Sequence, residues 1–157
     1  MAPIRVLFLC THNSARSQMA EGFLRRYGGE LFEVFSAGTD PSAIHPLTTE
    51  LMARAGVDIT SHRSKNVKDL KDQSFDFVIS VCDEAREVCP VFPGPHRLIH
   101  WRFADPMAAT GTPGEIKKAF GRIRDEIAGR VRLFAYAQTR RLPRSEAARQ
   151  ATTVVPA

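Results

Sequence analysis

The sequence contains little cysteine, few aromatic residues other than phenylalanine and no long apolar run. Its 157 residues include three cysteines, one tryptophan and two tyrosines. Three thiols cannot all pair in structural disulfides, so catalysis, metal binding or a redox relay are the roles that remain. No segment reaches the ~18 apolar residues that a membrane span needs. Met1-Ala2-Pro3 leads directly into an apolar stretch without a secretory leader. We therefore expect a cytoplasmic protein that does not bind a membrane.

The positive charge does not indicate a nucleic-acid-binding protein. The formal net charge is +5, of which residues 138–157 contribute +3 through four arginines and one glutamate. The rest of the chain has no basic stripe interleaved with aromatic residues, so we predict no nucleic-acid partner. We interpret residues 138–157 as a basic, disordered tail behind a single domain that spans residues 1–137.

Apolar runs alternate with helical patterns along the predicted domain. Strands are expected at about 4–9, 32–38, 75–81 and 97–101. Helices are expected at about 16–27, 46–55, 67–73 and 113–137. This order favours an α/β fold with a four-stranded parallel sheet flanked by helices on both faces. Ligands of such sheets bind beyond the carboxyl ends of the strands, where Cys10, Cys82 and Asp105 are expected to converge.

The stretch from Cys10 to Ser17 carries the clearest chemical pattern. Five residues separate Cys10 from Arg16, and they form the connection between a buried strand and a helix. A tight loop at this place turns backbone N–H groups inward and adds the positive end of the helix, which together bind an anion. Arg16 would hold a tetrahedral oxyanion through two parallel hydrogen bonds. Because Cys10 lies in this field and Ser17 can hydrogen-bond its sulfur, we expect the pKa of Cys10 to be lowered.

The predicted oxyanion-binding residues are all seven that follow Cys10: Thr11, His12, Asn13, Ser14, Ala15, Arg16 and Ser17. Asn13 is expected to brace the loop through side-chain hydrogen bonds to the backbone. His12 and His62 are candidates for the lining of the anion pocket, although a surface position is favoured for both. The competing interpretation of the whole stretch is a buried structural cysteine beside a surface arginine.

Two further cysteines, Cys82 and Cys89, follow the predicted third strand within one short segment. Two thiols that form a disulfide release two electrons, which a purely hydrolytic cysteine enzyme does not need. Alternatively, both could be small buried hydrophobic residues. They could also bind zinc with His96 and His100, although their spacing is wider than in most zinc sites. Asp105, before Pro106, is either a general acid or a turn-forming residue.

This combination resembles the thioredoxin-coupled arsenate reductases of the low-molecular-weight protein tyrosine phosphatase-like family. The resemblance covers about residues 4–137, and its most specific part is the spacing of the three cysteines. It includes the loop 10–17 and the segments Ser36-Ala37-Gly38, Ser61-His62-Arg63-Ser64 and Trp101-Arg102-Phe103-Ala104-Asp105-Pro106.

The resemblance implies a phosphatase-like fold and a thiol relay without a cofactor or metal ion. Cys10 would attack arsenate, and Asp105 would protonate the departing oxygen. Cys82 would then release arsenite and leave a Cys10–Cys82 disulfide, which Cys89 would convert into Cys82–Cys89. The reductant would be thioredoxin, or alternatively glutaredoxin with glutathione. Phosphate and sulfate would compete with arsenate as oxyanions, and we expect a monomer.

Geometry adds a prediction for the segment between the second and third cysteines. If residues 83–88 are helical, Cys82 and Cys89 lie about 10 Å apart along the axis. A disulfide needs Cα atoms within roughly 7 Å, so we expect this segment to unwind on oxidation.

Two alternative functions remain open. A low-molecular-weight phosphatase would need Cys10, Arg16 and Asp105 but not the other cysteines. A non-catalytic redox or zinc-binding module would use the later cysteines alone. Met107-Ala108-Ala109 stand where phosphatases of this fold carry tyrosines, which counts against a phosphatase. Lys65 stands where some family members have an acidic residue that binds a monovalent cation, so we predict no such cation.

Overall fold

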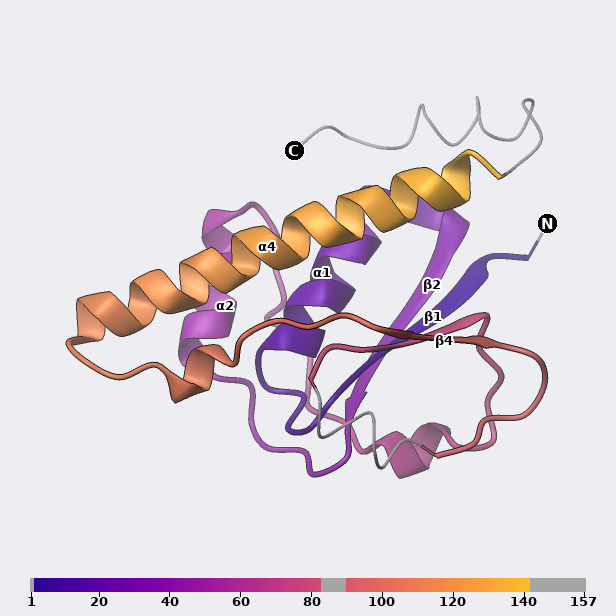
Figure 1. Ribbon diagram of the computed structural model, residues 1–157, viewed down its shortest axis with the longest axis horizontal. Coiled ribbons are helices and arrows are strands. Elements are labelled where there is room, and N and C mark those ends of the chain that lie inside the picture. The colour runs from indigo at the N-terminus through magenta and orange to yellow at the C-terminus, as the bar shows by residue number, and fades with distance from the viewer. Residues whose placement is uncertain (1, 83–89, 142–157) are drawn as a thin grey trace.

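The computed structural model describes residues 2–82 and 90–141, which form an α/β fold (Figure 1). The strands are β1 (Ile4–Cys10), β2 (Phe32–Gly38), β3 (Phe77–Ser80) and β4 (Arg97–His100). The α-helices are α1 (Arg16–Gly28), α2 (Pro46–Arg54) and α4 (Pro113–Thr139). Three short 3₁₀ helices are η1 (Gly29–Leu31), η2 (Val67–Leu70) and η3 (Pro106–Ala108).

The predicted four-stranded parallel sheet is confirmed, with the strand order β2-β1-β3-β4. The predicted helix at 67–73 is a single 3₁₀ turn, η2. The last helix ends at Thr139, so it continues beyond the predicted end at residue 137. Residues 142–157 of the predicted tail lie outside the described residues, as do Cys89 and residues 83–88. The prediction that this second segment unwinds on oxidation therefore stays a prediction.

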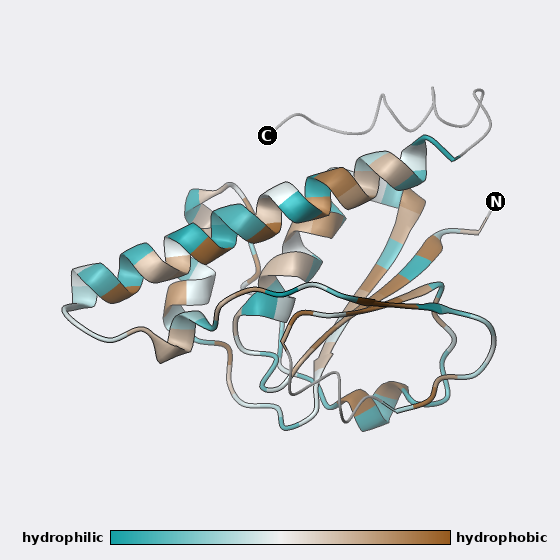
Figure 2. Ribbon diagram, in the orientation of Figure 1, coloured by the Kyte–Doolittle hydropathy of each residue, from teal (hydrophilic) through white to brown (hydrophobic). Residues whose placement is uncertain are grey.

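The two faces of the sheet have different covers. Helices α1 and α4 pack together on one face. There the ring of Phe134, on α4, packs against those of Phe32 and Phe77, with ring centroids 5.9 Å and 5.1 Å apart, respectively. Apolar residues run along the strands and alternate with polar residues on α4, as an amphipathic helix on a sheet requires (Figure 2). No described helix is long and apolar enough to cross a membrane.

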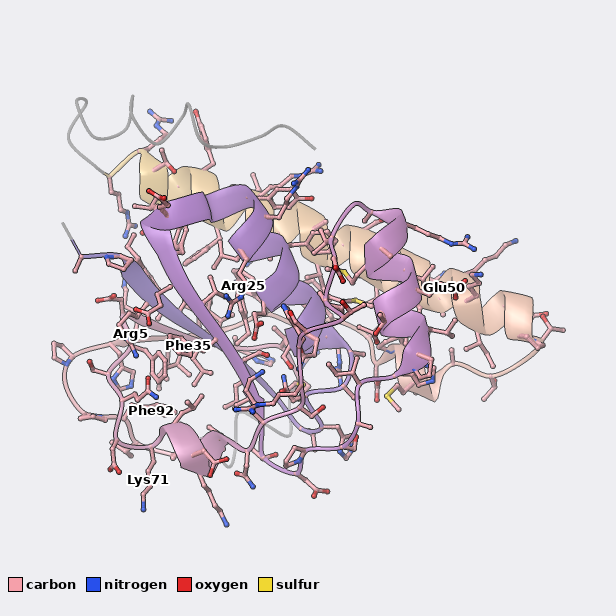
Figure 3. The ribbon with its side chains drawn as sticks, turned by 180° about the vertical axis from the view of Figure 1, so that it is seen from behind. Arg5, Arg25, Phe35, Glu50, Lys71 and Phe92 are labelled. Carbon is pink, nitrogen blue, oxygen red and sulfur yellow. The ribbon has the colours of Figure 1, made fainter. Side chains whose placement is uncertain are left out.

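Within the residues that the structure describes, side chains from loops and the 3₁₀ helix η2 cover the opposite face. The rings of Phe35 and Phe75 pack edge to face with centroids 5.4 Å apart, and those of Phe75 and Phe92 do the same at 5.2 Å. The guanidinium of Arg5 lies over Phe35 at 4.8 Å, beside this group of rings (Figure 3). Since both faces are covered, Val6, Leu7, Phe8 and Leu9 of the central strand β1 are fully buried.

The strand registers bring the predicted site residues to one edge of the sheet. Cys10 is the last residue of β1 and pairs with Gly38, the last residue of β2. On the other side, β3 ends at Ser80, two residues before Cys82, and β4 ends at His100, shortly before Asp105. The convergence expected from a parallel sheet is therefore present.

Candidate active site

The loop between β1 and α1 turns its carbonyl oxygens outward. Those of Cys10, Thr11, His12 and Ser14 accept hydrogen bonds from the backbone N–H groups of Thr39, Asp40, Ser42 and His45, respectively, at 2.8–3.2 Å. Because a trans peptide points its N–H group away from its carbonyl oxygen, the loop N–H groups turn to the inside. Helix α1 begins at Arg16, and its N-cap residue, Ala15, supplies no capping side chain. The loop is thus a concave ring of donors at the positive end of a helix, which suits a tetrahedral oxyanion.

The end of β2 has to approach this loop closely. A Cβ atom on Gly38 would lie 2.5 Å from the carbonyl oxygen of Thr11, so only glycine fits there. The loop itself passes through Asn13 with φ at 51°, a left-handed conformation that asparagine tolerates better than most residues. The local shape of the loop therefore depends on the residue types at these two positions.

Asn13 is fully buried, and its carboxamide is held in one orientation. Its Oδ1 accepts hydrogen bonds from the backbone N–H of Lys65 at 2.9 Å and from Gln18 Nε2 at 3.0 Å. Its Nδ2 donates to Ser17 Oγ at 2.8 Å and to Ser36 Oγ at 2.9 Å. The predicted bracing role of Asn13 agrees with these contacts, although side chains supply most of the partners instead of the backbone alone.

The fixed carboxamide leaves the Ser17 hydroxyl available as a donor to Cys10. Ser17 Oγ accepts a hydrogen bond from Asn13 Nδ2, so its own O–H group can donate to Cys10 Sγ, 2.8 Å away. The backbone N–H of Asn13 donates to the same sulfur at 3.2 Å. Two donors thus point at Cys10 Sγ, and both favour its thiolate.

Burial nevertheless has the larger effect on this thiol. It raises the pKa of Cys10, and the neighbouring Cys82 raises it further, while the hydrogen bonds from Ser17 and Asn13 lower it. The expectation of a lowered pKa is therefore wrong in direction. The spacing of the loop shows the donors around a cysteine but not the desolvation that comes with its position at the end of a central strand.

Arg16 and Asp105 lie together at the mouth of the loop. Arg16 Nη1 donates to the carbonyl oxygen of Phe103 at 3.1 Å, and its Nη2 lies 3.7 Å from Asp105 Oδ2. The Asp105 side chain is 44% exposed, and its Oδ1 accepts the backbone N–H of Met107 at the start of η3. Asp105 thus forms a turn before η3, which was the alternative to a general acid, and its carboxylate also lies near Arg16 at the loop.

Cys82 lies beside the loop, where its thiol shares a hydrogen bond with Thr11 Oγ1 at 3.3 Å. Both Cys10 and Cys82 are buried and free. Met107 reaches the loop from the other direction, because its Sδ accepts a hydrogen bond from Ser14 Oγ at 3.2 Å. The hydroxyl groups of Thr11 and Ser14 therefore already have protein partners. An anion in the loop would be bound by the backbone N–H groups of these residues instead.

The two histidine candidates differ in position. His12 is exposed, as favoured, and its Nδ1 donates to the carbonyl oxygen of Asp40. His62 is not a surface residue, because its Nδ1 lies 3.1 Å from Gln18 Oε1 and 3.2 Å from the buried carboxylate of Glu21. The sequence analysis did not identify Gln18, Glu21 and Ser36 as buried polar residues behind the loop. The helical spacing of apolar residues on α1 gives no sign that Gln18 and Glu21 are buried as well.

The proposed zinc ligands do not gather in the described part of the chain. His100 Nδ1 lies 2.7 Å from Ser80 Oγ, and His96 Nδ1 donates to the carbonyl oxygen of Gly94. Within residues 2–82 and 90–141, no three histidine, cysteine or acidic side chains are placed to hold a metal ion. A buried thiol, an anion-binding loop, a guanidinium and a nearby carboxyl group instead suit nucleophilic displacement at an oxyanion.

This arrangement is that of enzymes that attack oxyanions with a cysteine nucleophile at the end of a parallel strand. The model of the low molecular weight phosphotyrosine protein phosphatase family matches residues 5–144, and the chain belongs to this family. An arsenate reductase of Halalkalibacterium halodurans is 40% identical over 130 residues, which are 83% of this chain and 94% of that protein. An arsenate reductase of Bacillus subtilis is 38% identical over the same shares of both chains.

Solved structures agree with these sequence relatives. The thioredoxin-dependent arsenate reductase of Corynebacterium glutamicum superposes with a TM-score of 0.69 at 33% identity, over 87% of this chain. The match spans 62% of the corynebacterial chain. An arsenate reductase in a phosphate-binding state superposes with a TM-score of 0.69 at 29% identity, over 85% of this chain and 98% of that chain.

Proposed function

We propose that this chain is a cytoplasmic arsenate reductase that acts as a monomer through a thiol relay. The observation that carries the proposal is the second free thiol at the loop, because Cys82 meets Thr11 beside Cys10. A hydrolytic phosphatase has no use for that thiol. The relatives named arsenate reductases, which align with nearly their whole length, support the same assignment.

In the first step, the Cys10 thiolate attacks the arsenic of arsenate, which the loop N–H groups and Arg16 hold. A sulfur–arsenic bond forms and an arsenic–oxygen bond breaks, while Asp105 gives its proton to the departing oxygen, which leaves as water. The present contacts of Arg16 with Phe103 and Asp105 place its guanidinium at the loop mouth, where it would clamp the oxyanion.

In the second step, the Cys82 thiolate attacks Cys10 Sγ. The sulfur–arsenic bond breaks and its electron pair stays on arsenic, so arsenic(V) becomes arsenic(III) while two thiols become one disulfide. Cys89 then attacks Cys82 Sγ and releases the Cys10 thiolate. A dithiol protein of the thioredoxin class reduces the Cys82–Cys89 disulfide; glutaredoxin with glutathione is the alternative reductant. Phosphate and sulfate would compete for the loop.

The test is arsenate-dependent NADPH oxidation with thioredoxin and thioredoxin reductase. We expect turnover by the natural protein and none by Cys10→Ser, Cys82→Ser or Cys89→Ser. Turnover with only glutathione and glutaredoxin would keep the activity but replace the reductant. No arsenate reduction with either system, together with hydrolysis of an aryl phosphate that Cys82→Ser leaves unchanged, would instead establish a phosphatase.

A further inference from the structure

A buried carboxylate lies close to the loop but outside the steps proposed above. The side chain of Glu21, on α1, is only 4% exposed. Its Oε2 lies 3.3 Å from Arg25 Nε and 3.2 Å from His62 Nδ1, and its Oε1 lies 3.6 Å from Lys65 Nζ. Ser36 Oγ donates a hydrogen bond to the same Oε1 at 2.7 Å. A charge in such a position needs compensation by neighbours, since the solvent cannot supply it.

These contacts close a ring with the residues that hold Cys10. An ionised carboxylate only accepts hydrogen bonds, so Ser36 must donate to Glu21 and accept from Asn13 Nδ2. Asn13 Oδ1 accepts the backbone N–H of Lys65, whose ammonium group returns to Glu21. Lys65 therefore touches both ends of one hydrogen-bonded chain, once through its backbone and once through its side chain.

We propose that Lys65 and Glu21 form a positioning pair that orders this ring, so that Asn13 stays oriented and the Ser17 hydroxyl donates a hydrogen bond to Cys10 Sγ. The ammonium group of Lys65 is the counter-charge beside the buried Glu21 carboxylate, which accepts the hydrogen bond from Ser36. This proposal rests on the role given to Cys10 under the proposed function. It adds to that role a polar support behind the loop, supplied by α1, β2 and the segment before η2.

Lys65 is better placed to balance the charge of Glu21 than Arg25 or His62, the two other groups near this carboxylate. The Arg25 side chain is 55% exposed, so solvent screens its charge. Burial lowers the pKa of His62, which favours the neutral imidazole there. The Lys65 side chain is 24% exposed and is anchored by a 2.8 Å hydrogen bond to the carbonyl oxygen of Arg63. Burial lowers the pKa of Lys65 more than Glu21 raises it. A lysine, however, starts about four pKa units above a histidine, so a lowered pKa still favours the ammonium form at neutral pH.

The decisive variant is Lys65→Met, which keeps the aliphatic chain and removes the charge. The Glu21 carboxylate then lacks its ammonium partner, and a second anion at Cys10 becomes less favourable. The hydrogen-bonded ring also loses its order. Both effects raise the pKa of Cys10. We expect alkylation of Cys10 by iodoacetamide, followed by mass spectrometry of its peptide, to shift its pH midpoint upward. Half a pH unit would make the reaction about threefold slower at neutral pH.

Three further variants separate charge from packing. Lys71→Met is the matched control, because Lys71 is exposed and points away from the domain beside η2 (Figure 3); we expect no shift. Lys65→Arg, which keeps the charge, should react as the natural protein does. The double variant Lys65→Met/Glu21→Gln removes both charges and keeps an acceptor for Ser36, so we expect it to return toward the natural midpoint.

The alkylation assay needs neither arsenate nor a reductant, so its outcome is independent of the proposed activity. A Lys65→Met midpoint equal to that of Lys71→Met would overturn the positioning pair. A double variant that shifts as far as Lys65→Met alone would overturn it as well, because a role in packing alone predicts that result. Circular dichroism spectra and melting temperatures show whether each variant is folded.

Discussion

The two sides of the candidate active site are built in different ways. Apart from the exposed His12, the loop that follows β1 is largely buried. Each of its polar side chains and most of its carbonyl oxygens have partners on neighbouring elements. The segment that carries Asp105 is largely exposed and contacts the loop mainly through Arg16 and through Met107. One side is fixed by the fold, and the other rests on a few contacts that involve exposed side chains.

This difference matches what each side would do in the reaction. A nucleophile and an anion-binding ring gain from being fixed in advance, because no reorganisation is then needed when charge develops. An acid that follows a departing oxygen has to remain accessible to water and product. Substitutions in the loop should therefore affect both stability and chemistry, whereas substitutions in the Asp105 segment should affect chemistry alone.

The largest effect is expected for Asn13→Ala. The variant loses the carboxamide hydrogen bonds and places alanine at φ of 51°, and these changes together cost about 2–4 kcal/mol of unfolding free energy. Urea unfolding measures this change. Asn13→Gly keeps the backbone conformation and should recover about 1 kcal/mol of the loss. Equal stability of Asn13→Ala and the natural protein would show that the loop is not fixed by its side-chain contacts.

Asp105→Asn tests the exposed side of the comparison. Asparagine keeps an acceptor for the N–H of Met107 but has no proton to give, so kcat should fall about 100-fold. The melting temperature and the alkylation rate of Cys10 should remain those of the natural protein, since Asp105 is exposed and does not touch the sulfur. A fall in melting temperature as large as that of Asn13→Ala would remove the distinction between the two sides.

Ser17→Ala is expected to give a smaller effect that depends on pH. The hydrogen bond from Ser17 lowers the pKa of Cys10, so its loss adds to the upward shift that burial already causes. The thiolate fraction rises with pH, and the variant needs a higher pH to reach the same fraction. We expect roughly fivefold slower alkylation at neutral pH and a smaller difference at alkaline pH, which a series of rates against pH would show. If the ratio of the two alkylation rates, Ser17→Ala to natural protein, were the same at every pH, an effect through the pKa of Cys10 would be excluded.

The sequence allowed the sheet, its parallel strands and the loop to be predicted because their signals are local. An apolar run that ends at Cys10, a fixed spacing to Arg16 and a helical pattern after it occur within a few residues. The burial of Cys10 depends on the strands on both sides of β1, so the direction of its pKa shift could not be read from the loop. The same holds for Glu21, whose partners Ser36 and Lys65 come from distant segments.

The smallest effect is expected for Met107→Ala. Met107 is 46% exposed, and its only described polar contact with the loop is the hydrogen bond that its sulfur accepts from Ser14 Oγ. Sulfur is a weak acceptor, and Asp105 still caps η3 through the backbone of residue 107, so the acid stays in place. We expect kcat/KM for arsenate to change by no more than about twofold and the melting temperature to stay the same. A tenfold loss would mean that the loop itself holds the Asp105 segment through this contact, and the two sides of the site would then be one preorganised unit.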